Sequence, residues 1–307
     1  MKAVRVHAFG GVDALVYEDV PRPVAGPGQV LIRVAAAGVG PWDGWVRAGK
    51  SVLPQPLPLT PGADLSGVIE ALGPEVAGFA LGQAVFGVTN ARFTGAYAEY
   101  ALAEASMIAP TPTELTDVEA ASVPVVVCTE YQMLSRHAAV TAGQTVLVLG
   151  GAGNVGAYAV QLAQISGARV VATARGHQFD FLRTLGAVEP IAAGAPPPPR
   201  LAAKMDAVID TVGGAALAQA FEWLRPGGVL ISAVAEPDQG LALRHRVRAR
   251  FILVDVTTAD LLHLAGLFEI RQLRPRVGEV LRLSEARIAH RMLEDGKHRA
   301  GKIVLVP

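Results

Sequence analysis

The chain contains one cysteine, Cys128, among 307 residues. A single thiol cannot form an intramolecular disulfide, and it cannot supply a zinc site that needs two or more thiolate ligands. An excess of either charge is also absent, because 27 basic and 27 acidic residues give a formal net charge of zero. Neither nucleic acid nor an anionic membrane surface is therefore expected as the main partner, since both select basic proteins.

Long uninterrupted apolar runs are absent as well. The most apolar stretch, 137–168, has no Asp, Glu, Lys or Arg, but glycines divide it into pieces shorter than the roughly 20 residues of a membrane helix. Residues 1–7 alternate between apolar and polar, which is typical of a strand and not of a signal peptide. These patterns predict a cytoplasmic protein with no membrane partner.

The pattern of apolar runs and of Gly and Pro residues changes near residue 120, which predicts two domains. Before it, short strand-like runs are separated by Gly and Pro, as in a β-rich domain. After it, strand-like runs alternate with helical segments, which predicts an α/β fold with a doubly wound parallel sheet. The expected strands of this second part are 146–149, 169–174, 207–210, 229–232 and 251–254, and the expected helices are 157–166, 179–185 and 215–224. A helix at 284–295 and a strand at 302–306 are expected to close the chain.

A glycine-rich turn stands between the strand at 146–149 and the helix that follows it. Gly151, Gly153 and Gly156 form a Gly-x-Gly-x-x-Gly pattern that encloses Asn154 and Val155. In a dinucleotide-binding fingerprint the first glycine allows the tight turn, the second lets the backbone approach the pyrophosphate, and the third lets helix and strand pack closely. A purely structural strand-to-helix turn is the alternative interpretation.

The end of the next strand distinguishes NADP from NAD. An NAD site carries an acidic residue there for the ribose hydroxyls, whereas this strand ends in Ala-Arg-Gly-His, and the first acid is Asp180 in the next helix. Arg175 is suited to the 2′-phosphate of NADP, with His177 as a possible second donor. The residues therefore predict NADPH, with a solvated loop arginine as the alternative.

Taken together, these segments resemble the medium-chain dehydrogenase/reductase superfamily, and within it the zinc-independent quinone oxidoreductase branch. The matching segments are 37–43, 61–69, 82–87, 95–100, 185–187, 206–210, 226–228 and 301–305. The resemblance implies a Rossmann-type dinucleotide-binding domain, 123–273, inserted into a GroES-like β-rich catalytic domain made of 1–122 and 274–307, with the active site in the cleft.

The resemblance also implies a homodimer paired through the edge strand of the Rossmann sheet. Arg246, Arg248 and Arg250 alternate with apolar residues there, as expected for a half-exposed strand. A nucleic-acid role of this one basic segment is the less favoured alternative.

Zinc can be tested against the same family pattern. Zinc-dependent relatives carry their catalytic ligands at the positions of Gly40, Ala63 and Val125, and none of these residues can bind a metal. The site is therefore expected to hold no zinc. Cys128 lies on the apolar hinge helix, where packing is expected in preference to a reactive thiol.

By the resemblance, Thr129 is expected against the nicotinamide, and Asp43 and Asp64 beside the cleft. The alternative is that both aspartates only hold backbone amides of their loops. Trp45 stands where the branch commonly has a tyrosine, and Tyr97 is a remaining phenol, either a proton donor or structural. Two lysines, Lys297 and Lys302, are considered as contacts to the cofactor phosphate.

The function expected from these residues is NADPH-dependent, zinc-independent hydride transfer to a quinone or a related conjugated carbonyl acceptor, a small molecule that is electrophilic by itself. Two alternatives remain open. One is reduction of an alkenal or enoyl double bond, and the other is an NADPH-binding protein without significant catalysis.

Overall fold

The computed structural model describes all residues, 1–307, and divides them into two compact units. The first unit consists of Met1–Val125 and Val256–Pro307, and the second of Val126–Asp255. The second unit thus ends at Asp255, whereas the sequence places the end of the nucleotide-binding domain at 273. Residues 256–273 belong with the first unit because the hydroxyl of Thr258 donates to the carbonyls of Ala105 and Ile108, at 3.1 and 2.7 Å.

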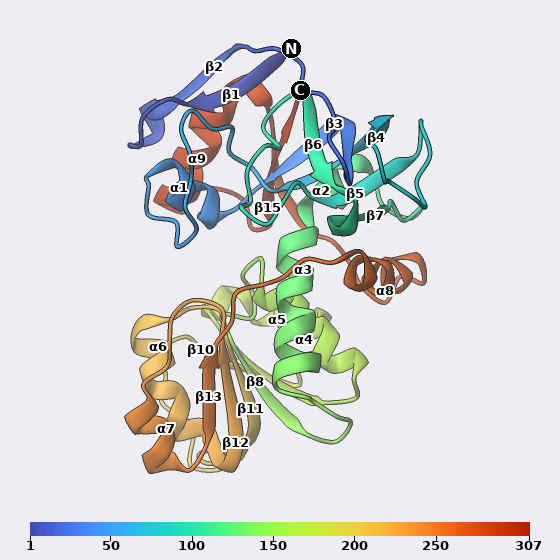
Figure 1. The fold of residues 1–307 in the computed structure, drawn as a ribbon. Helices are drawn as coiled ribbons and strands as arrows, with labels where there is room; N and C mark the ends of the chain where they lie inside the picture. Colours follow the sequence, from blue (N-terminus) through green and yellow to red (C-terminus); the bar gives the residue numbers. More distant parts are fainter. The chain divides into compact units, whose positions relative to one another are not determined.

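The first unit is built on a seven-stranded sheet with the order β14-β15-β3-β4-β5-β7, in which β6 also pairs with β3 (Figure 1). A separate hairpin, β1 with β2, completes its β structure. The strands are β1 (Lys2–Val6), β2 (Leu15–Asp19), β3 (Gln29–Val39), β4 (Asp64–Leu72), β5 (Ala84–Val88), β6 (Tyr100–Glu104), β7 (Ile108–Pro110), β14 (Val277–Arg282) and β15 (Lys302–Val306). The helices are α1 (Pro41–Arg47), α2 (Asp117–Ser122), α8 (Thr258–Glu269) and α9 (Ala286–Asp295), with short 3-10 turns η1 (Val12–Ala14), η2 (Ala105–Met107) and η6 (Leu283–Glu285).

Strand β15, late in the sequence, pairs with β3, early in the sequence. Ile303, Val304 and Leu305 are fully buried and pair antiparallel with β3. Helix α9 packs beside them through Ala286 and Ala289. The first unit is therefore assembled from two segments, Met1–Val125 and Val256–Pro307.

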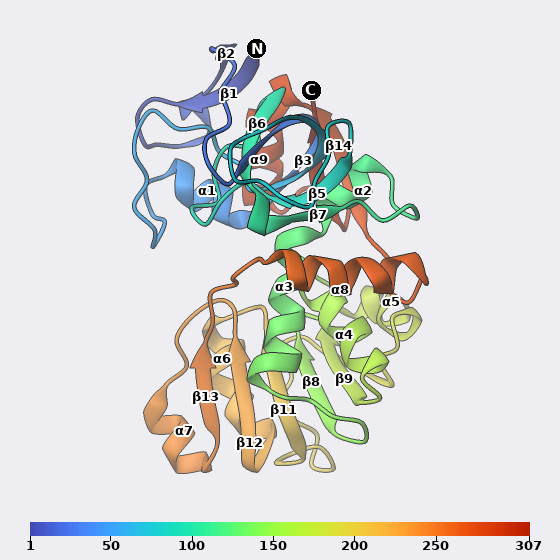
Figure 2. The ribbon, with the colours of Figure 1, turned by 45° about the vertical axis from the view of Figure 1, so that its right-hand side comes forward.

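The second unit holds a six-stranded, all-parallel sheet with the order β10-β9-β8-β11-β12-β13. In order along the chain this is 3-2-1-4-5-6, the Rossmann arrangement, so the expected fold class is confirmed. Figure 1 shows α4 and α5 on one side of the sheet and α6 and α7 on the other, and Figure 2 shows the strands side by side. The strands are β8 (Thr145–Leu149), β9 (Arg169–Ala174), β10 (Glu189–Ala192), β11 (Met205–Asp210), β12 (Leu224–Ser232) and β13 (Arg248–Phe251).

Five α-helices and three helical turns accompany this sheet, and one helix and one strand of the unit depart from the sequence prediction. They are α3 (Pro124–Tyr131), which runs on as the π-helical turn η3 (Gln132–His137), α4 (Gly156–Ile165), α5 (Phe179–Thr184) after the turn η4 (Gly176–Gln178), α6 (Gly214–Gln219) with the turn η5 (Ala220–Trp223), and α7 (Gln239–His245). The helix expected at 215–224 ends early because Phe221 and Trp223 turn into the core and Leu224 already begins β12. The strand expected at 251–254 instead ends at Phe251, where its pairing with Ser232 stops.

None of the helices combines the length and the apolar content that a membrane span requires.

We expect Gly156→Ala to destabilise the protein by roughly 1–3 kcal/mol, the usual range for overpacking. A Cβ at this position would lie 2.4 Å from the carbonyl oxygen of Gly150 and 2.9 Å from the Cα of Gly151. Both contacts are with backbone, which cannot rotate away. Urea unfolding of the variant measures the effect.

Gly176→Ala is the matched control, because a Cβ there would meet nothing within 4 Å. Equal unfolding midpoints for the two variants would contradict the steric explanation.

Candidate functional site

The glycine-rich turn after β8 is fastened to the neighbouring strand β9. The amide of Gly150 donates to the hydroxyl of Thr173, and the amide of Gly151 donates to its carbonyl, both at 3.0 Å. Gly150 has φ +75°, and a Cβ on Gly151 would lie 2.9 Å from that of Ala172. Glycine is therefore required for both the turn and its close approach to β9. Sequence reasoning did not identify Thr173, although its place near the end of β9 is a usable signal.

Helix α4 begins directly after this turn, with Val155 at the N-cap and Asn154 just before it. The first amides of a helix have no intrahelical acceptors, and together with the helix dipole they attract anionic oxygens. A Cβ on Gly153 would approach only the carbonyl oxygen of Gly150, at 3.2 Å, so its outer side is open. The residues of the fingerprint are thus brought together as a cradle that fits a pyrophosphate.

Arg175 and His177 lie just beyond β9, and both are exposed. The nearest acid along the chain, Asp180, forms a 2.6 Å ion pair with Arg183. No acidic side chain pairs with the guanidinium of Arg175. Thr129, from α3, is buried in the same unit as the glycine turn, with 7% of its surface exposed.

In the first unit, Asp43 and Tyr97 form a buried hydrogen-bonded pair. The hydroxyl of Tyr97 donates to Oδ2 of Asp43 at 3.0 Å, and the amide of Gly40 donates to the same oxygen at 2.8 Å. Oδ1 of Asp43 has no partner, and both side chains are fully buried. Burial raises the pKa of Asp43 to about 7, against the opposing effects of the Gly40 amide and Lys302. Burial and the nearby Asp43 also raise the pKa of Tyr97 well above its ordinary value.

Asp64 lies close enough to Asp43 to raise its pKa electrostatically, and it is held in a buried ion pair. Nζ of Lys302 donates to Oδ2 of Asp64 at 2.8 Å and lies 4.2 Å from the ring centroid of Trp42. The other oxygen of Asp64 accepts from the amide of Val125 at 2.8 Å. Lys302 therefore forms an ion pair with a carboxylate inside the first unit and is not a phosphate contact.

Three further residues, Arg47, His290 and Glu294, extend this polar network, and sequence reasoning missed them. Arg47 donates to Nδ1 of His290 at 2.9 Å and to the carbonyl of Gly10 at 3.1 Å, and it pairs with Glu294. The His290 ring meets that of Tyr97 edge-on, with centroids 5.8 Å apart. Burial, and then the charge of Arg47, lower the pKa of His290 to about 3, so the ring is neutral.

Trp45 lies apart from the buried pair of Asp43 and Tyr97. It is 52% exposed and lines a pocket of about 350 Å³ between α1 and α9, together with Arg47 and His290. Phe86 is fully buried in the core, so it packs within the β domain and does not present a ring to a ligand.

No three His, Cys, Asp or Glu side chains gather where they could hold a metal ion. Gly40 caps α1, Ala63 is fully buried, and Val125 gives its amide to Asp64. Cys128 is buried, as expected for a packing residue.

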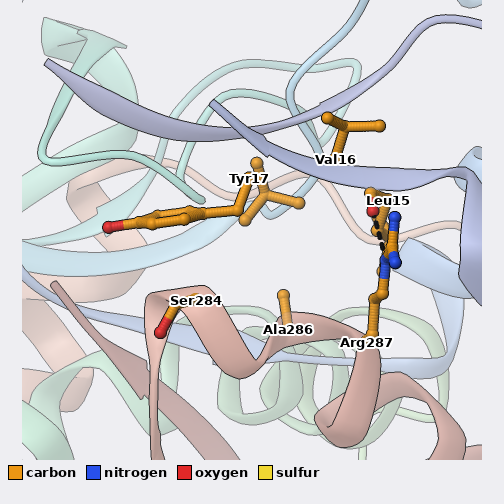
Figure 3. A pocket seen from close by; sticks show the side chains of 7 residues that line it. Leu15, Val16, Tyr17, Ser284, Ala286 and Arg287 are labelled. Atoms are coloured by element: carbon orange, nitrogen blue, oxygen red, sulfur yellow. Dashed lines mark hydrogen bonds between the residues drawn. The ribbon is translucent and has the colours of Figure 1, made fainter. Parts of the chain in front are cut away.

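A second pocket of the first unit, about 280 Å³ in volume, lies between β2 and the start of α9 (Figure 3). Figure 3 shows Arg287 bound to the carbonyl of Leu15, a 2.5 Å hydrogen bond, with Tyr17 on the opposite side. Its one cationic side chain is thus already used by the backbone, and the pocket lacks the convergent polar groups of a candidate site.

Comparison with known proteins matches two families. Residues 26–113 match the alcohol dehydrogenase GroES-like domain, and residues 185–305 match the zinc-binding dehydrogenase family. The quinone oxidoreductase of Homo sapiens is 40% identical over 175 residues, which cover 57% of this chain and 53% of that protein. The matched part thus spans about half the length of such curated relatives.

Two other similar proteins cover more of the chain. The 2-methylene-furan-3-one reductase of Solanum lycopersicum is 35% identical over 250 residues, 77% of this chain and 64% of that protein. The structure of the quinone oxidoreductase from Coxiella burnetii superposes with a TM-score of 0.89 at 32% identity, covering 100% of this chain and 99% of that one.

We expect the ionisation of Asp43 to make stability depend on pH. Its pKa is about 7 when folded and has an ordinary value of 3.8, so the folded protein binds more protons between these limits and loses stability as the pH rises through them. In Asp43→Asn this loss, roughly 4 kcal/mol from the pKa difference, should be absent. Urea unfolding from about pH 4 to about pH 8 measures it.

Asparagine can preserve the hydrogen bonds of Asp43, because the Gly40 amide and the Tyr97 hydroxyl both donate to the same oxygen, Oδ2. The single amide oxygen of asparagine can accept both. Asp13→Asn, at a side chain 86% exposed, is the control. Parallel stability curves for the native protein and Asp43→Asn would show that Asp43 ionises normally.

Proposed function

This chain belongs to the medium-chain dehydrogenase/reductase superfamily, in its quinone oxidoreductase branch, and we propose that it is an NADPH-dependent, zinc-independent reductase. Its acceptor is a quinone or a related conjugated carbonyl compound. The family implies a nicotinamide cofactor, which supplies the hydride when it is bound.

The cofactor assignment depends on two features that follow neighbouring strands: the glycine-rich turn after β8 and Arg175 after β9. In a 3-2-1-4-5-6 sheet, ligands bind at the carboxyl ends of the strands where the order reverses, here between β8 and β11. The cradle follows β8, and Arg175 follows β9 without an acidic partner. An exposed guanidinium in place of a carboxylate favours the 2′-phosphate of NADP over a free ribose hydroxyl.

Independence from zinc rests on the identity of three residues. Gly40, Ala63 and Val125 occupy the positions at which zinc-dependent relatives carry ligands, and none has a donor side chain. Without a Lewis acid, the acceptor must be able to delocalise negative charge itself, as quinones and conjugated enones do. This argues against oxidation of a simple alcohol.

The acidic residues have different roles in this proposal. Reduction of a quinone to a hydroquinone takes one hydride and one proton. Asp43, with a pKa of about 7 and a hydrogen bond to Tyr97, stores such a proton at neutral pH. Asp64 is neutralised by Lys302 and positions the start of α3 through Val125. The exposed ring of Trp45 offers a surface for a flat acceptor.

A second candidate is reduction of a conjugated carbon–carbon double bond. It is supported by the 35% identity to the 2-methylene-furan-3-one reductase over 77% of this chain. The chemistry is related, because hydride addition to an enone also places the negative charge on an oxygen by conjugation.

A homodimer through β13 is part of the proposal. This strand is the edge of the six-stranded sheet, and Arg248 and Arg250 on it are exposed. An edge strand presents unpaired backbone donors and acceptors that a second copy can satisfy.

The acceptor class is tested by turnover of NADPH, and in parallel of NADH, with a small para-quinone, a conjugated enone, a 2-alkenal and a primary alcohol. We expect oxidation of NADPH with the quinone and no reaction with the alcohol, unaffected by a zinc chelator. Turnover only with the enone or alkenal would favour the second candidate. Stabilisation by NADPH in thermal unfolding without turnover of any acceptor would indicate a binding protein, and stoichiometric zinc would overturn the mechanism.

The cofactor preference is tested with Arg175→Asp. A hydrogen bond to a charged group contributes about 1.5–3 kcal/mol, so the ratio of NADPH to NADH efficiency should fall roughly tenfold to a hundredfold. Arg200→Asp, at an exposed arginine of the same unit, is the control. An unchanged ratio in Arg175→Asp would remove the basis for NADPH.

A further inference from the structure

Glu130 is a buried carboxyl group that none of the roles above uses. It lies in the last turn of α3, has no exposed surface, and neither of its side-chain oxygens has a hydrogen-bond partner. An ionised carboxylate removed from water without a partner is strongly unfavourable. A neutral carboxylic acid in the same place loses far less solvation.

The charged group that acts on Glu130 is itself acidic. Asp210, at the end of β11, accepts hydrogen bonds through Oδ1 from the amides of Val212 and Gly213, at 3.0 and 2.9 Å. Its Oδ2 accepts from the hydroxyl of Ser232 at 2.7 Å. Both oxygens of Asp210 are thus already hydrogen-bonded, and its negative charge opposes a second one on Glu130. No cation offsets this repulsion.

We propose that Glu130 is a buried proton-binding site: it keeps its proton in the folded second unit, and loss of that proton loosens α3 and the turn η3. Burial, and then the charge of Asp210, raise the pKa of Glu130 well above its ordinary value, which agrees with the contacts. The inference rests on the second unit alone and does not depend on the proposed reaction.

The position of Glu130 explains which segment responds. Directly after it the helix changes to π-helical spacing, in which the amide of Ala138 donates to the carbonyl of Met133 at 2.8 Å. The start of this segment is anchored by the side chain of Gln132, which donates to the carbonyl of Asp255 at 2.6 Å. A charged Glu130 can reach water only if the last turn of α3 opens.

Proton binding at Glu130 gives stability a definite pH dependence. The folded protein holds one more proton than the unfolded chain between the ordinary pKa of a glutamate, about 4.3, and the raised value. Stability therefore falls as the pH rises through this window. The folding equilibrium constant should fall by up to about tenfold per pH unit relative to a variant that cannot ionise.

Glu130→Gln is that variant, because it is neutral and nearly isosteric. Urea unfolding of both proteins from about pH 5 to about pH 9 should show curves that diverge, with the variant more stable at high pH. Glu222→Gln, at an exposed glutamate of the same unit, should follow the native curve. Hydrogen exchange in 126–137, corrected for its intrinsic pH dependence, should rise with pH in the native protein and not in Glu130→Gln.

A spectroscopic measurement keeps the inference testable if the variant folds poorly. The infrared carbonyl band of a protonated carboxylic acid should persist in the native protein at neutral pH, where exposed carboxyl groups are ionised. Absence of this band, or parallel unfolding curves for native protein and Glu130→Gln, would overturn the inference.

Discussion

The buried ion pair between Lys302 and Asp64 is the interaction on which the first unit depends. It joins the first residue of β15 to the first residue of β4, and Trp42 of α1 lies against the same ammonium group. The second oxygen of Asp64 holds the amide of Val125, at the start of α3. Removing one partner of such a pair leaves an uncompensated buried charge, which typically costs about 3–5 kcal/mol. The pair therefore connects segments that lie 238 positions apart in the sequence.

The fold was predictable where its signals are local. The strand, glycine turn and helix from Thr145 to Ile165 follow from apolar runs and three glycines, and they fix the class of the second unit. Residues 256–273 group with the first unit, and nothing in their sequence reveals that Thr258 bonds to η2 and β7. Such long-range contacts leave no periodicity in the sequence.

Some residues of the candidate site were likewise predictable from the sequence, and others were not. Asp43, Asp64 and Tyr97 were identified by the resemblance, and Arg175 by the absence of an acid after β9. Their partners could not be identified, because Arg47 and His290 are 243 positions apart in the chain and meet only after α1 packs near α9. No motif in the sequence distinguishes Glu130. It becomes a candidate only through its burial and the nearby charge of Asp210 in the folded protein.

The order of the units along the chain has a consequence for biosynthesis. The second unit is continuous, so all of its strands are available once Asp255 has been synthesised. The first unit is not, because residues 37–39 of β3 pair with β15 and the charge of Asp64 is neutralised by Lys302. During translation the sheet that contains β3 therefore remains incomplete until β15 emerges, while the inserted parallel sheet can already be folded. The unit that begins before the inserted domain is thus completed after it.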